Sequence, residues 1–236
     1  MFDLIFQHPD FVVINKHPEI SVHKDQQEHG LVETVSAVLG LPNLYLVHRL
    51  DKMTSGLLIL ATQAQAAAEL AQCFAKREID KFYLAISAHK PKKKQGLICG
   101  DMEKSRRSAW KLMKSQQNPA VTQFFSLSLE QGRRAFLCKP YTGKTHQIRV
   151  ALKSLSAPIL GDGIYTGATD SDRGYLHAYA ICFVYQGQRF EFRCDPRTQS
   201  QGVYWQSPTL ERHLNQGDWQ SPWLLNWPTL PGRLTR

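Results

Sequence analysis

Short apolar segments joined by tight turns constrain the fold of this 236-residue chain more than any other feature of its sequence. The segment AICFVYQGQRFEFRC (180–194) has apolar residues on both sides of Gln186-Gly187, which is typical of a β-hairpin. The segments AVTQFFSLSLE (120–130) and RRAFLCKP (133–140) flank Gln131-Gly132 in the same way. Because strands that follow each other through tight turns pair antiparallel, the sequence predicts an α+β fold with a largely antiparallel mixed sheet flanked by helices.

Two further segments have the residue spacing of helices. In LVETVSAVLG (31–40) the apolar residues recur at helical spacing, and the segment ends at Gly40, a residue that commonly terminates helices. The Ala-rich segment QAQAAAELAQCFAKR (63–77) follows Thr62, and we expect Thr62 and Gln65 to form a capping box at its start. Between these helices, SGLLILAT (55–62) reads as a buried strand.

No linker or low-complexity segment divides the chain, and we predict a single domain over residues 1–236. The tail from about Ser207 carries Trp219, Trp223 and Trp227 among prolines. Because three exposed tryptophans would reduce solubility, we expect this tail to pack back on the domain.

The charge and the cysteines restrict the classes of function. The chain has 29 Lys and Arg against 20 Asp and Glu, a net charge of +9, which favours a polyanionic partner such as RNA or DNA. From charge alone, a basic protein without a nucleic-acid role is equally compatible. The five cysteines form no CxxC pair, so we expect neither a disulfide framework nor a zinc site. No apolar stretch approaches the ~20 residues of a membrane span, and we expect a cytoplasmic protein without membrane association.

Basic residues cluster in the middle third of the chain, in KPKKKQG (90–96) and EKSRRSAWKLMK (103–114). A basic segment with Trp110 inside it has the composition to follow a phosphate backbone and stack a base. A solvated loop with a core tryptophan is the alternative. The candidate backbone contacts are Lys92, Lys93, Lys94, Arg106 and Arg107.

Two charged residues lie in apolar surroundings. Asp51 lies within LYLVHRLDKMTSGLLIL (44–60), and a buried carboxylate needs a cation, preferably Arg, whose planar fork pairs with it and stays charged. Arg149 lies between apolar residues in YTGKTHQIRVAL (141–152), where a glycine turn leads into an expected helix. Each residue alone is compatible with a structural salt bridge, but together they indicate a functional site.

Three segments carry a resemblance to a known family. HRLDKMTSGLLILA (48–61), KFYLA (81–85) and TGKTHQIRV (142–150) resemble, in this order, the successive signatures of the RluA-type RNA pseudouridine synthases. Four other segments are similar to that family's remaining motifs: FVVINKHPEISVH (11–23), PAVTQF (119–124), APILGDGIY (157–165) and YLHA (175–178). The resemblance covers residues from about 3 to 196.

The resemblance implies the pseudouridine synthase fold and the isomerisation of a specific uridine to pseudouridine in rRNA or tRNA, without a cofactor or a metal. Asp51 matches the family's catalytic aspartate, Arg149 the arginine that pairs with it, and Tyr83 the aromatic residue against the target base. Whether the aspartate attacks covalently or removes a sugar proton stays open. We further expect a monomer without an S4 domain, in which the catalytic domain and its basic insert recognise RNA.

Other motif residues are expected to bind substrate: His48, Arg49, Lys139, Lys144, Thr145, His146, Gln147 and Ile148. We expect His177 to be a structural histidine. The chain departs from the family pattern at His17, Met53, Lys144 and Ala151, which bears on the choice of substrate. The alternative function is a non-catalytic RNA-binding or RNA-remodelling protein on the same scaffold. The presence of Asp51, Tyr83 and Arg149 favours the enzyme, because pure binding has no need of a carboxylate that repels phosphate.

Overall fold

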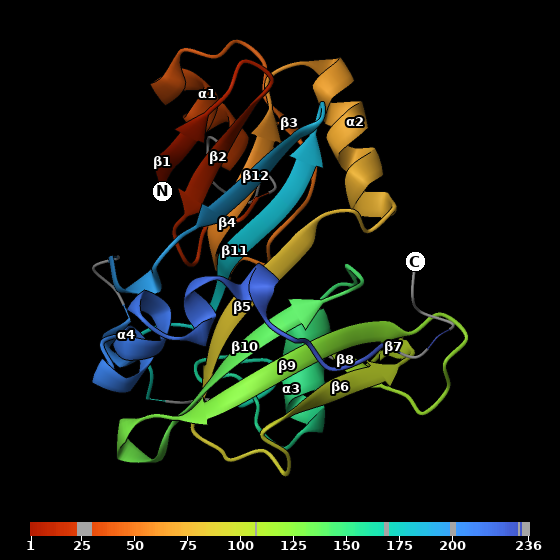
Figure 1. Cartoon of the computed structure of the whole chain (residues 1–236), viewed down its shortest axis with the longest axis vertical. Helices are drawn as coiled ribbons and strands as arrows, with labels where there is room; N and C mark the ends of the chain where they lie inside the picture. The colour runs from red at the N-terminus through yellow and green to blue at the C-terminus, as the bar shows by residue number, and fades with distance from the viewer. Residues whose placement is uncertain (23–29, 107, 168–169, 199–201, 231, 233–236) are drawn as a thin grey trace. The chain divides into compact units, whose positions relative to one another are not determined.

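The computed structural model describes residues 1–22, 30–106, 108–167, 170–198, 202–230 and 232. Its chain forms two compact units (Figure 1). Unit 1 consists of Met1–Asp80 and His177–Gln199, and unit 2 consists of Lys81–Leu176 and Ser200–Arg236. Both units contain helices and strands, which confirms the predicted α+β class, whereas the single domain over residues 1–236 stays a prediction.

Unit 1 is built on a mixed sheet in the order β1-β2-β4-β11-β12, with β3 also paired to β4. Its pairs are antiparallel except β4 with β11, which run parallel with His177 opposite Ser55. The elements are β1 (Phe2–Gln7), β2 (Phe11–Lys16), α1 (Leu31–Leu39), β3 (Tyr45–Leu46), β4 (Ser55–Ala61), α2 (Ala64–Ala75), β11 (Leu176–Tyr185) and β12 (Gln188–Arg193). The hairpin predicted at Gln186-Gly187 is therefore confirmed.

The core of unit 1 lies around β2 and β4, in which every residue is buried. The ring of Phe11 packs against those of Phe183 and Phe190, with centroids 5.7 and 5.3 Å away. The strand β4 also comes unusually close to β11 at Gly56. This glycine has a φ of +105°, and a Cβ there would lie 2.3 Å from the Ala178 carbonyl oxygen. Only glycine therefore allows this approach.

The ends of the two helices in unit 1 show what the sequence predicted and what it did not. Helix α1 ends as predicted, with Gly40 in the left-handed region at a φ of +65°. The capping box predicted for α2 is wrong. The Thr62 hydroxyl donates to the Pro9 carbonyl at 2.5 Å, and the Gln65 amide donates to Glu69 at 3.0 Å. The Thr62 side chain therefore binds the turn between β1 and β2 and does not cap the helix.

Unit 2 contains an antiparallel sheet in the order β5-β10-β9-β6 and a separate hairpin, β7-β8. None of the helices among the described residues is long and apolar enough to cross a membrane. The elements are β5 (Asp80–Ser87), β6 (Gln95–Gly100), β7 (Met102–Lys104), β8 (Trp110–Leu112), β9 (Ala120–Ser128), β10 (Arg134–Pro140), α3 (Gln147–Ser154) and α4 (Pro208–Asn215). Single 3-10 turns are η1 (Glu130–Gly132), η2 (Pro196–Thr198, in unit 1), η3 (Val203–Trp205), η4 (Asp218–Gln220) and η5 (Pro222–Leu224).

The C-terminal tail packs on one face of the unit 2 sheet. The Phe82 ring lies 6.4 Å from the Trp223 ring and 5.8 Å from the Trp227 ring, and Phe125 lies 4.9 Å from Trp227. Trp219, earlier in the tail, is also buried. The prediction that the tail packs back is confirmed, and one face of this sheet is thereby closed.

Glu130 connects the β9–β10 turn to the tail. Its carboxylate accepts hydrogen bonds from the Ser207 hydroxyl at 2.5 Å and from the hydroxyl and amide of Thr209 at 2.5 and 3.1 Å. Ser207 in turn caps α4 by accepting from the Leu210 amide at 3.1 Å. The hydrogen bonds from Ser207 and Thr209 lower the pKa of Glu130 from 4.5 to about 2.

We expect Glu130→Gln to lower the free energy of unfolding by about 1 kcal/mol at pH 7, the usual weight of a helix cap on an exposed surface. Because folding lowers the pKa of Glu130, its stabilisation is present above pH 4.5 and is lost as the pH falls toward 2. Thermal unfolding of both proteins from pH 7 to pH 2 measures this. The control is Glu103→Gln, which changes an exposed pair with Lys111. A stability difference that stays constant down to pH 2 would contradict the assignment.

Candidate active site

Asp51 lies in the loop that connects β3 to β4. Its carbonyl accepts the Thr54 amide at 3.0 Å, which closes a tight turn. On either side of Asp51, Leu50 and Met53 are buried, Arg49 and Lys52 are exposed, and Asp51 itself is half-buried. The apolar neighbours thus anchor the main chain of the loop and leave the carboxylate partly accessible to solvent. Met53, one of the departures from the family pattern, is such an anchor.

A buried lysine is hydrogen-bonded to this loop. Lys16, at the end of β2, is 0% exposed, and its Nζ donates to the carbonyls of His17, Ile20 and Lys52 at 3.0, 2.7 and 3.1 Å. A buried ammonium group is tolerated only when such acceptors replace water. Lys16 therefore ties the end of β2 to the residue that follows Asp51. The motifs did not point to this residue, although a lysine that ends the apolar run FVVINK is the signal for it.

Among the described residues of unit 1, His48, His177 and His17 contact other parts of the protein. His48 Nε2 accepts the Ile59 amide at 3.0 Å, and its ring stacks on Phe74 with centroids 4.5 Å apart. His177 is buried between the Ser55 hydroxyl, at 2.7 Å, and the Cys194 carbonyl, at 2.9 Å, as expected for a structural histidine. His17 lies 3.0 Å from a carboxylate oxygen of Asp3. The substrate contacts expected of His48 and Arg49 stay predictions.

Tyr83 and Lys139 lie on opposite faces of the unit 2 sheet. Tyr83 is half-buried and pairs with Cys138 across β5 and β10. Side chains alternate between faces along a strand, so Lys139 shares a face with Phe82, and its Nζ lies 5.3 Å from that ring. The Phe82 face is the one covered by the tail. The structure therefore does not bring Lys139 together with Tyr83.

Gln147 fixes the start of α3 against the sheet. Its Oε1 accepts the Thr142 hydroxyl at 2.6 Å and the Lys144 amide at 3.0 Å. Its Nε2 donates to the Val121 carbonyl at 2.9 Å and to the Thr122 hydroxyl at 3.0 Å. Thr122 and Tyr83 share a face by register, because Phe124 lies opposite Cys138. Helix α3 therefore lies over the face that carries Tyr83, and the buried Gln147 is a structural residue.

The other residues predicted around α3 differ in accessibility. Lys144 Nζ donates to the Asn118 carbonyl at 2.6 Å, Ile148 is buried, and Thr145 is exposed. Ala151, another departure from the family pattern, is buried. Of these predicted residues, Thr145 is the one whose side chain is most accessible to a ligand.

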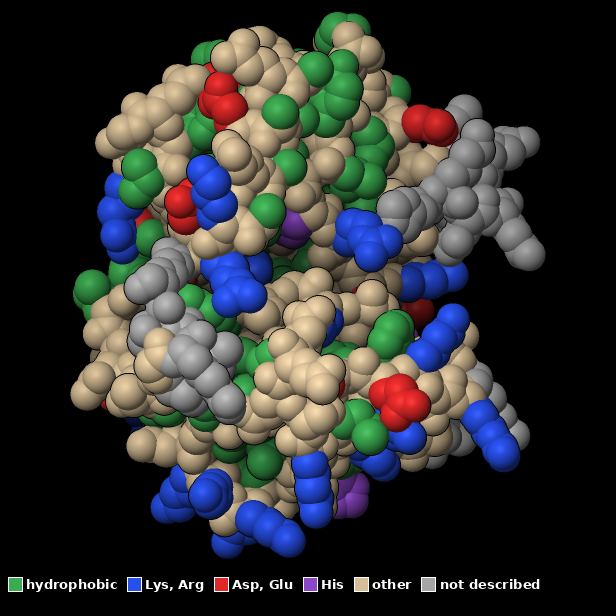
Figure 2. Space-filling model, turned by 90° about the vertical axis from the view of Figure 1, so that its right-hand side faces the viewer, with side chains coloured by type: hydrophobic (Ala, Val, Ile, Leu, Met, Phe, Trp, Pro, Cys, Tyr) green, Lys and Arg blue, Asp and Glu red, His purple; other side chains and the backbone are tan. Residues whose placement is uncertain are grey.

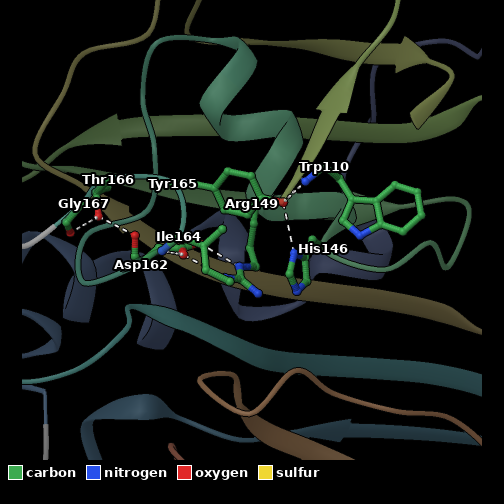
Figure 3. Close-up of polar contacts among 8 residues, drawn as sticks. All are labelled: Trp110, His146, Arg149, Asp162, Ile164, Tyr165, Thr166 and Gly167. Carbon is green, nitrogen blue, oxygen red and sulfur yellow. Dashed lines mark hydrogen bonds and ion pairs between the residues drawn. The ribbon is translucent and has the colours of Figure 1, made fainter. Parts of the chain in front are cut away.

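Arg149 forms a buried ion pair with Asp162 (Figure 3). Its Nε donates to Asp162 Oδ2 at 2.7 Å and its Nη2 to Oδ1 at 2.8 Å, and the two side chains are 6% and 0% exposed. Oδ1 also accepts the Ile164 amide at 3.1 Å. Next to it, Gly161 has a φ of +76°, and a Cβ there would lie 1.9 Å from the Arg173 carbonyl oxygen. The chain reaches this position only with glycine.

Asp162 is a site residue to which the motifs gave no role. The sequence predicts Asp51 as the partner of Arg149; Asp51 belongs to the other unit, and that pair stays a prediction. The signal for Asp162 is the LGD sequence in the segment 157–165, where a glycine precedes an acidic residue after an apolar run. The segment is held beside Tyr83's strand, because the Leu160 amide donates to the Ile86 carbonyl at 2.8 Å.

Arg149 and Tyr83 together offer an oriented cation and an aromatic side chain over one face of a sheet. A bidentate carboxylate fixes the plane of the guanidinium group, which stays charged throughout the accessible pH range. Among the described residues, no group of three or more His, Cys, Asp or Glu side chains is arranged to hold a metal ion. Within unit 2, Tyr83 therefore supplies a phenol and Arg149 a cation of fixed orientation.

Comparisons with known proteins show the family to which the chain is similar. The family model described as RNA pseudouridylate synthase matches residues 10–154. An RNA pseudouridine synthase of Haemophilus influenzae is 54% identical over 209 residues, which are 88% of this chain and 92% of that protein. A Rickettsia bellii protein described as ribosomal large subunit pseudouridine synthase C is 32% identical over 169 residues, or 69% of this chain and 56% of that protein.

Two solved structures have a similar fold. Human RNA pseudouridylate synthase domain containing 1 superposes with a TM-score of 0.69 at 25% identity, over 82% of this chain and 83% of that chain. Human RNA pseudouridylate synthase domain containing 4 also gives a TM-score of 0.69, at 26% identity over 83% and 89% of the two chains. The fold predicted from the resemblance is confirmed.

We expect Asp162→Asn to lower the free energy of unfolding by about 3–5 kcal/mol, because Arg149 would keep its charge in a buried place without a carboxylate. Urea unfolding followed by circular dichroism measures the loss. The matched control is Asp170→Asn, the same change at an exposed position later in the chain, for which we expect a change within about 0.5 kcal/mol. Equal effects of the two substitutions would show that the ion pair does not stabilise the unit.

Proposed function

The chain belongs to the RNA pseudouridylate synthase family, and we propose that it isomerises one specific uridine of a structured RNA, either rRNA or tRNA, with Asp51 as the essential carboxylate. Membership of the family makes the chain an RNA pseudouridine synthase, an isomerase that acts on uridine in RNA. One observation carries the finer proposal: the family match over residues 10–154 contains Asp51, Tyr83 and Arg149, each within the motif that resembles the family's signature.

The reaction rearranges the uridine without any net gain or loss of atoms. The N1–C1′ bond breaks, the uracil turns over, a C5–C1′ bond forms, and the proton on C5 leaves while one is returned to N1. Asp51 acts on the nucleotide either as a nucleophile or as the base that removes a sugar proton. Both roles need an ionised carboxylate, and a cation beside a carboxylate favours its charged form.

Tyr83 and Arg149 serve the same reaction in different ways. A uridine that leaves its RNA stack loses about 1–3 kcal/mol, and the ring of Tyr83 restores a stacking surface for it. The Tyr83 hydroxyl is also the group we propose to accept the C5 proton. The role of Arg149 is to keep Asp51 charged, and its bidentate bonds to Asp162 at 2.7 and 2.8 Å fix the orientation of its guanidinium group.

The basic loops supply affinity for the RNA backbone. Lys92, Lys93 and Lys94 are exposed in the loop between β5 and β6, and Arg106 is exposed between β7 and β8; Arg107 lies outside the described residues. Figure 2 shows Lys and Arg side chains gathered at the lower end of unit 2, the end where Figure 1 shows the β5–β6 loop. Phosphate contacts from such side chains position the RNA without reading its sequence.

Two further points complete the proposal. We favour rRNA over tRNA because the Rickettsia bellii relative is described as a ribosomal large subunit synthase, and we propose a monomer that works in the cytoplasm. The non-catalytic alternative predicts that no modification disappears without the gene. Pseudouridine mapping of total RNA from cells with and without the gene separates the two: a uridine that loses its modification supports the enzyme and identifies its target.

We expect Asp51→Asn to abolish pseudouridine formation and to leave the fold and the affinity for RNA nearly unchanged. The amide is neutral and cannot act as nucleophile or base. The loss of one negative charge does not weaken the binding of RNA phosphate groups. Tritium release from RNA labelled at C5 of uridine measures turnover, and filter binding measures affinity. The control is Asp218→Asn, at an exposed position of unit 2, which should keep wild-type turnover. An active Asp51→Asn protein would exclude this mechanism.

We expect the triple variant Lys92→Gln, Lys93→Gln and Lys94→Gln to weaken binding to all RNAs alike. The slope of log affinity against log salt should flatten by about 0.7 for each phosphate of single-stranded RNA that is no longer neutralised. Turnover at saturating RNA should stay unchanged, because Asp51 and Arg149 are untouched.

The matched control for this triple variant removes three exposed charges elsewhere, with Lys76→Gln, Arg189→Gln and Arg212→Gln. It has the same net charge, so any general effect of charge appears in both proteins. Equal salt slopes in the two variants would reject the β5–β6 loop as a site of RNA binding.

A further inference from the structure

At one edge of the β7-β8 hairpin, a backbone amide donates its hydrogen bond to a side chain and not to a neighbouring strand. Among the described residues β7 and β8 pair with each other and with no third strand, with Lys104 opposite Trp110. The backbone amide of Trp110 points outward and donates to the hydroxyl of Tyr165 at 2.9 Å (Figure 3). The base of the hairpin is held separately, because the Met113 amide donates to the Asp101 carbonyl at 2.8 Å. Tyr165 therefore fixes the part of β8 nearer the turn.

The same hydroxyl reaches the start of α3. It lies 3.0 Å from His146 Nδ1, and the two rings meet edge to face at 5.7 Å. His146 is the residue before α3 and has a left-handed backbone, with a φ of 58°. The Tyr165 ring is buried, and its centroid lies 5.1 Å from Cζ of Arg149. The backbone amide of Tyr165 donates to the Asp162 carbonyl at 3.1 Å. One buried tyrosine thus contacts the hairpin, the helix start and both partners of the ion pair.

The hairpin carries side chains suited to RNA. Lys104 and Arg106 are exposed, and Lys111 forms an exposed pair with Glu103 at 3.1 Å. In Figure 3 the indole of Trp110 extends away from the Tyr165 hydroxyl that holds its backbone. Cations beside an aromatic ring are the combination that binds a phosphate backbone and stacks a base.

We propose that Tyr165 is a positioning residue: its hydroxyl holds the β7-β8 hairpin in one place relative to Arg149, so that RNA bound by the hairpin lies in register with the catalytic groups. The inference rests on the proposed function, because it assigns the hairpin to the RNA substrate of this enzyme. Its physical basis is that a buried polar group left without its partner costs more than the bond itself contributes. Without the hydroxyl, the Trp110 amide must turn toward water, and the hairpin loses its fixed position.

Tyr165→Phe tests the hydroxyl alone, because it keeps the ring beside Arg149. Tyr204→Phe is the matched control, at a tyrosine of unit 2 in η3 whose ring centroid lies 3.6 Å from Cζ of Arg133. A third protein carries Lys104→Gln with Arg106→Gln, and a fourth combines these changes with Tyr165→Phe. Affinity is measured with a fluorescent 20-residue uridine oligonucleotide over a range of salt concentrations. Turnover is measured on RNA purified from cells that lack the gene, at increasing RNA concentration.

We expect Tyr165→Phe to weaken oligonucleotide binding and to raise KM by about threefold to tenfold, the weight of one buried hydrogen bond. The turnover number at saturating RNA should change by less than twofold, and Tyr204→Phe should match the wild type. When Lys104 and Arg106 are already neutralised, adding Tyr165→Phe should cause a smaller loss of affinity than it does in the wild type, because the hydroxyl acts through the hairpin.

Three results would overturn the inference: wild-type binding by Tyr165→Phe, losses that add up in the combined protein, or a fall in the turnover number with KM unchanged. The last result would mean that the tyrosine acts on Arg149 directly. A wild-type protein that forms no pseudouridine in this RNA would instead count against the proposed function, while the oligonucleotide measurements still decide on the role of Tyr165 in placing the hairpin.

Discussion

The buried ion pair between Arg149 and Asp162 is the interaction on which the candidate site of unit 2 depends. Removing both charges from water is costly, and the two short bonds, at 2.7 and 2.8 Å, offset that cost only because their geometry is bidentate. The local structure serves this geometry. Gly161 lets the chain turn where a Cβ would collide with Arg173. Gln147 fixes the start of α3 through two hydrogen bonds to the sheet and two to the loop before the helix. An arginine held in this way keeps its charge and its direction while RNA binds and leaves.

Much of the fold could be predicted because its signals are local. The hairpin at Gln186-Gly187 and the helix that ends at Gly40 need only the turn chemistry and the residue spacing of short segments. The capping box at Thr62 and Gln65 failed for the opposite reason: the Thr62 hydroxyl binds Pro9, fifty-three positions earlier in the chain. The preference of threonine for helix N-termini favours a cap at this position. The hydroxyl instead binds a tertiary partner that the local sequence does not reveal.

The sequence motifs name candidate site residues, but they do not give the geometry in which these residues lie. A motif names neighbouring residues, but it does not say which face of a strand each of them occupies. Lys139 follows Cys138, the partner of Tyr83, and for that reason it lies on the opposite face, beside Phe82. Gln147 belongs to the same signature as Arg149, yet its side chain is fully used by the protein. Lys16 and Asp162 went unrecognised because their partners become neighbours only in the folded chain.

The positions of the cations change what the net charge of +9 means for RNA binding. Lys16, Arg134, Arg149 and Arg173 are buried, at 0%, 5%, 5% and 4% exposure, and the hydrogen bonds described for them are to carbonyl, hydroxyl and carboxylate oxygens of the protein. Such groups cannot displace counterions from RNA, because a buried cation does not reach a phosphate. Only exposed cations, such as Lys92 to Lys94, are therefore able to contribute to the salt dependence of binding. It should be far weaker than the total of 29 basic residues suggests, because only side chains that reach a phosphate contribute to it.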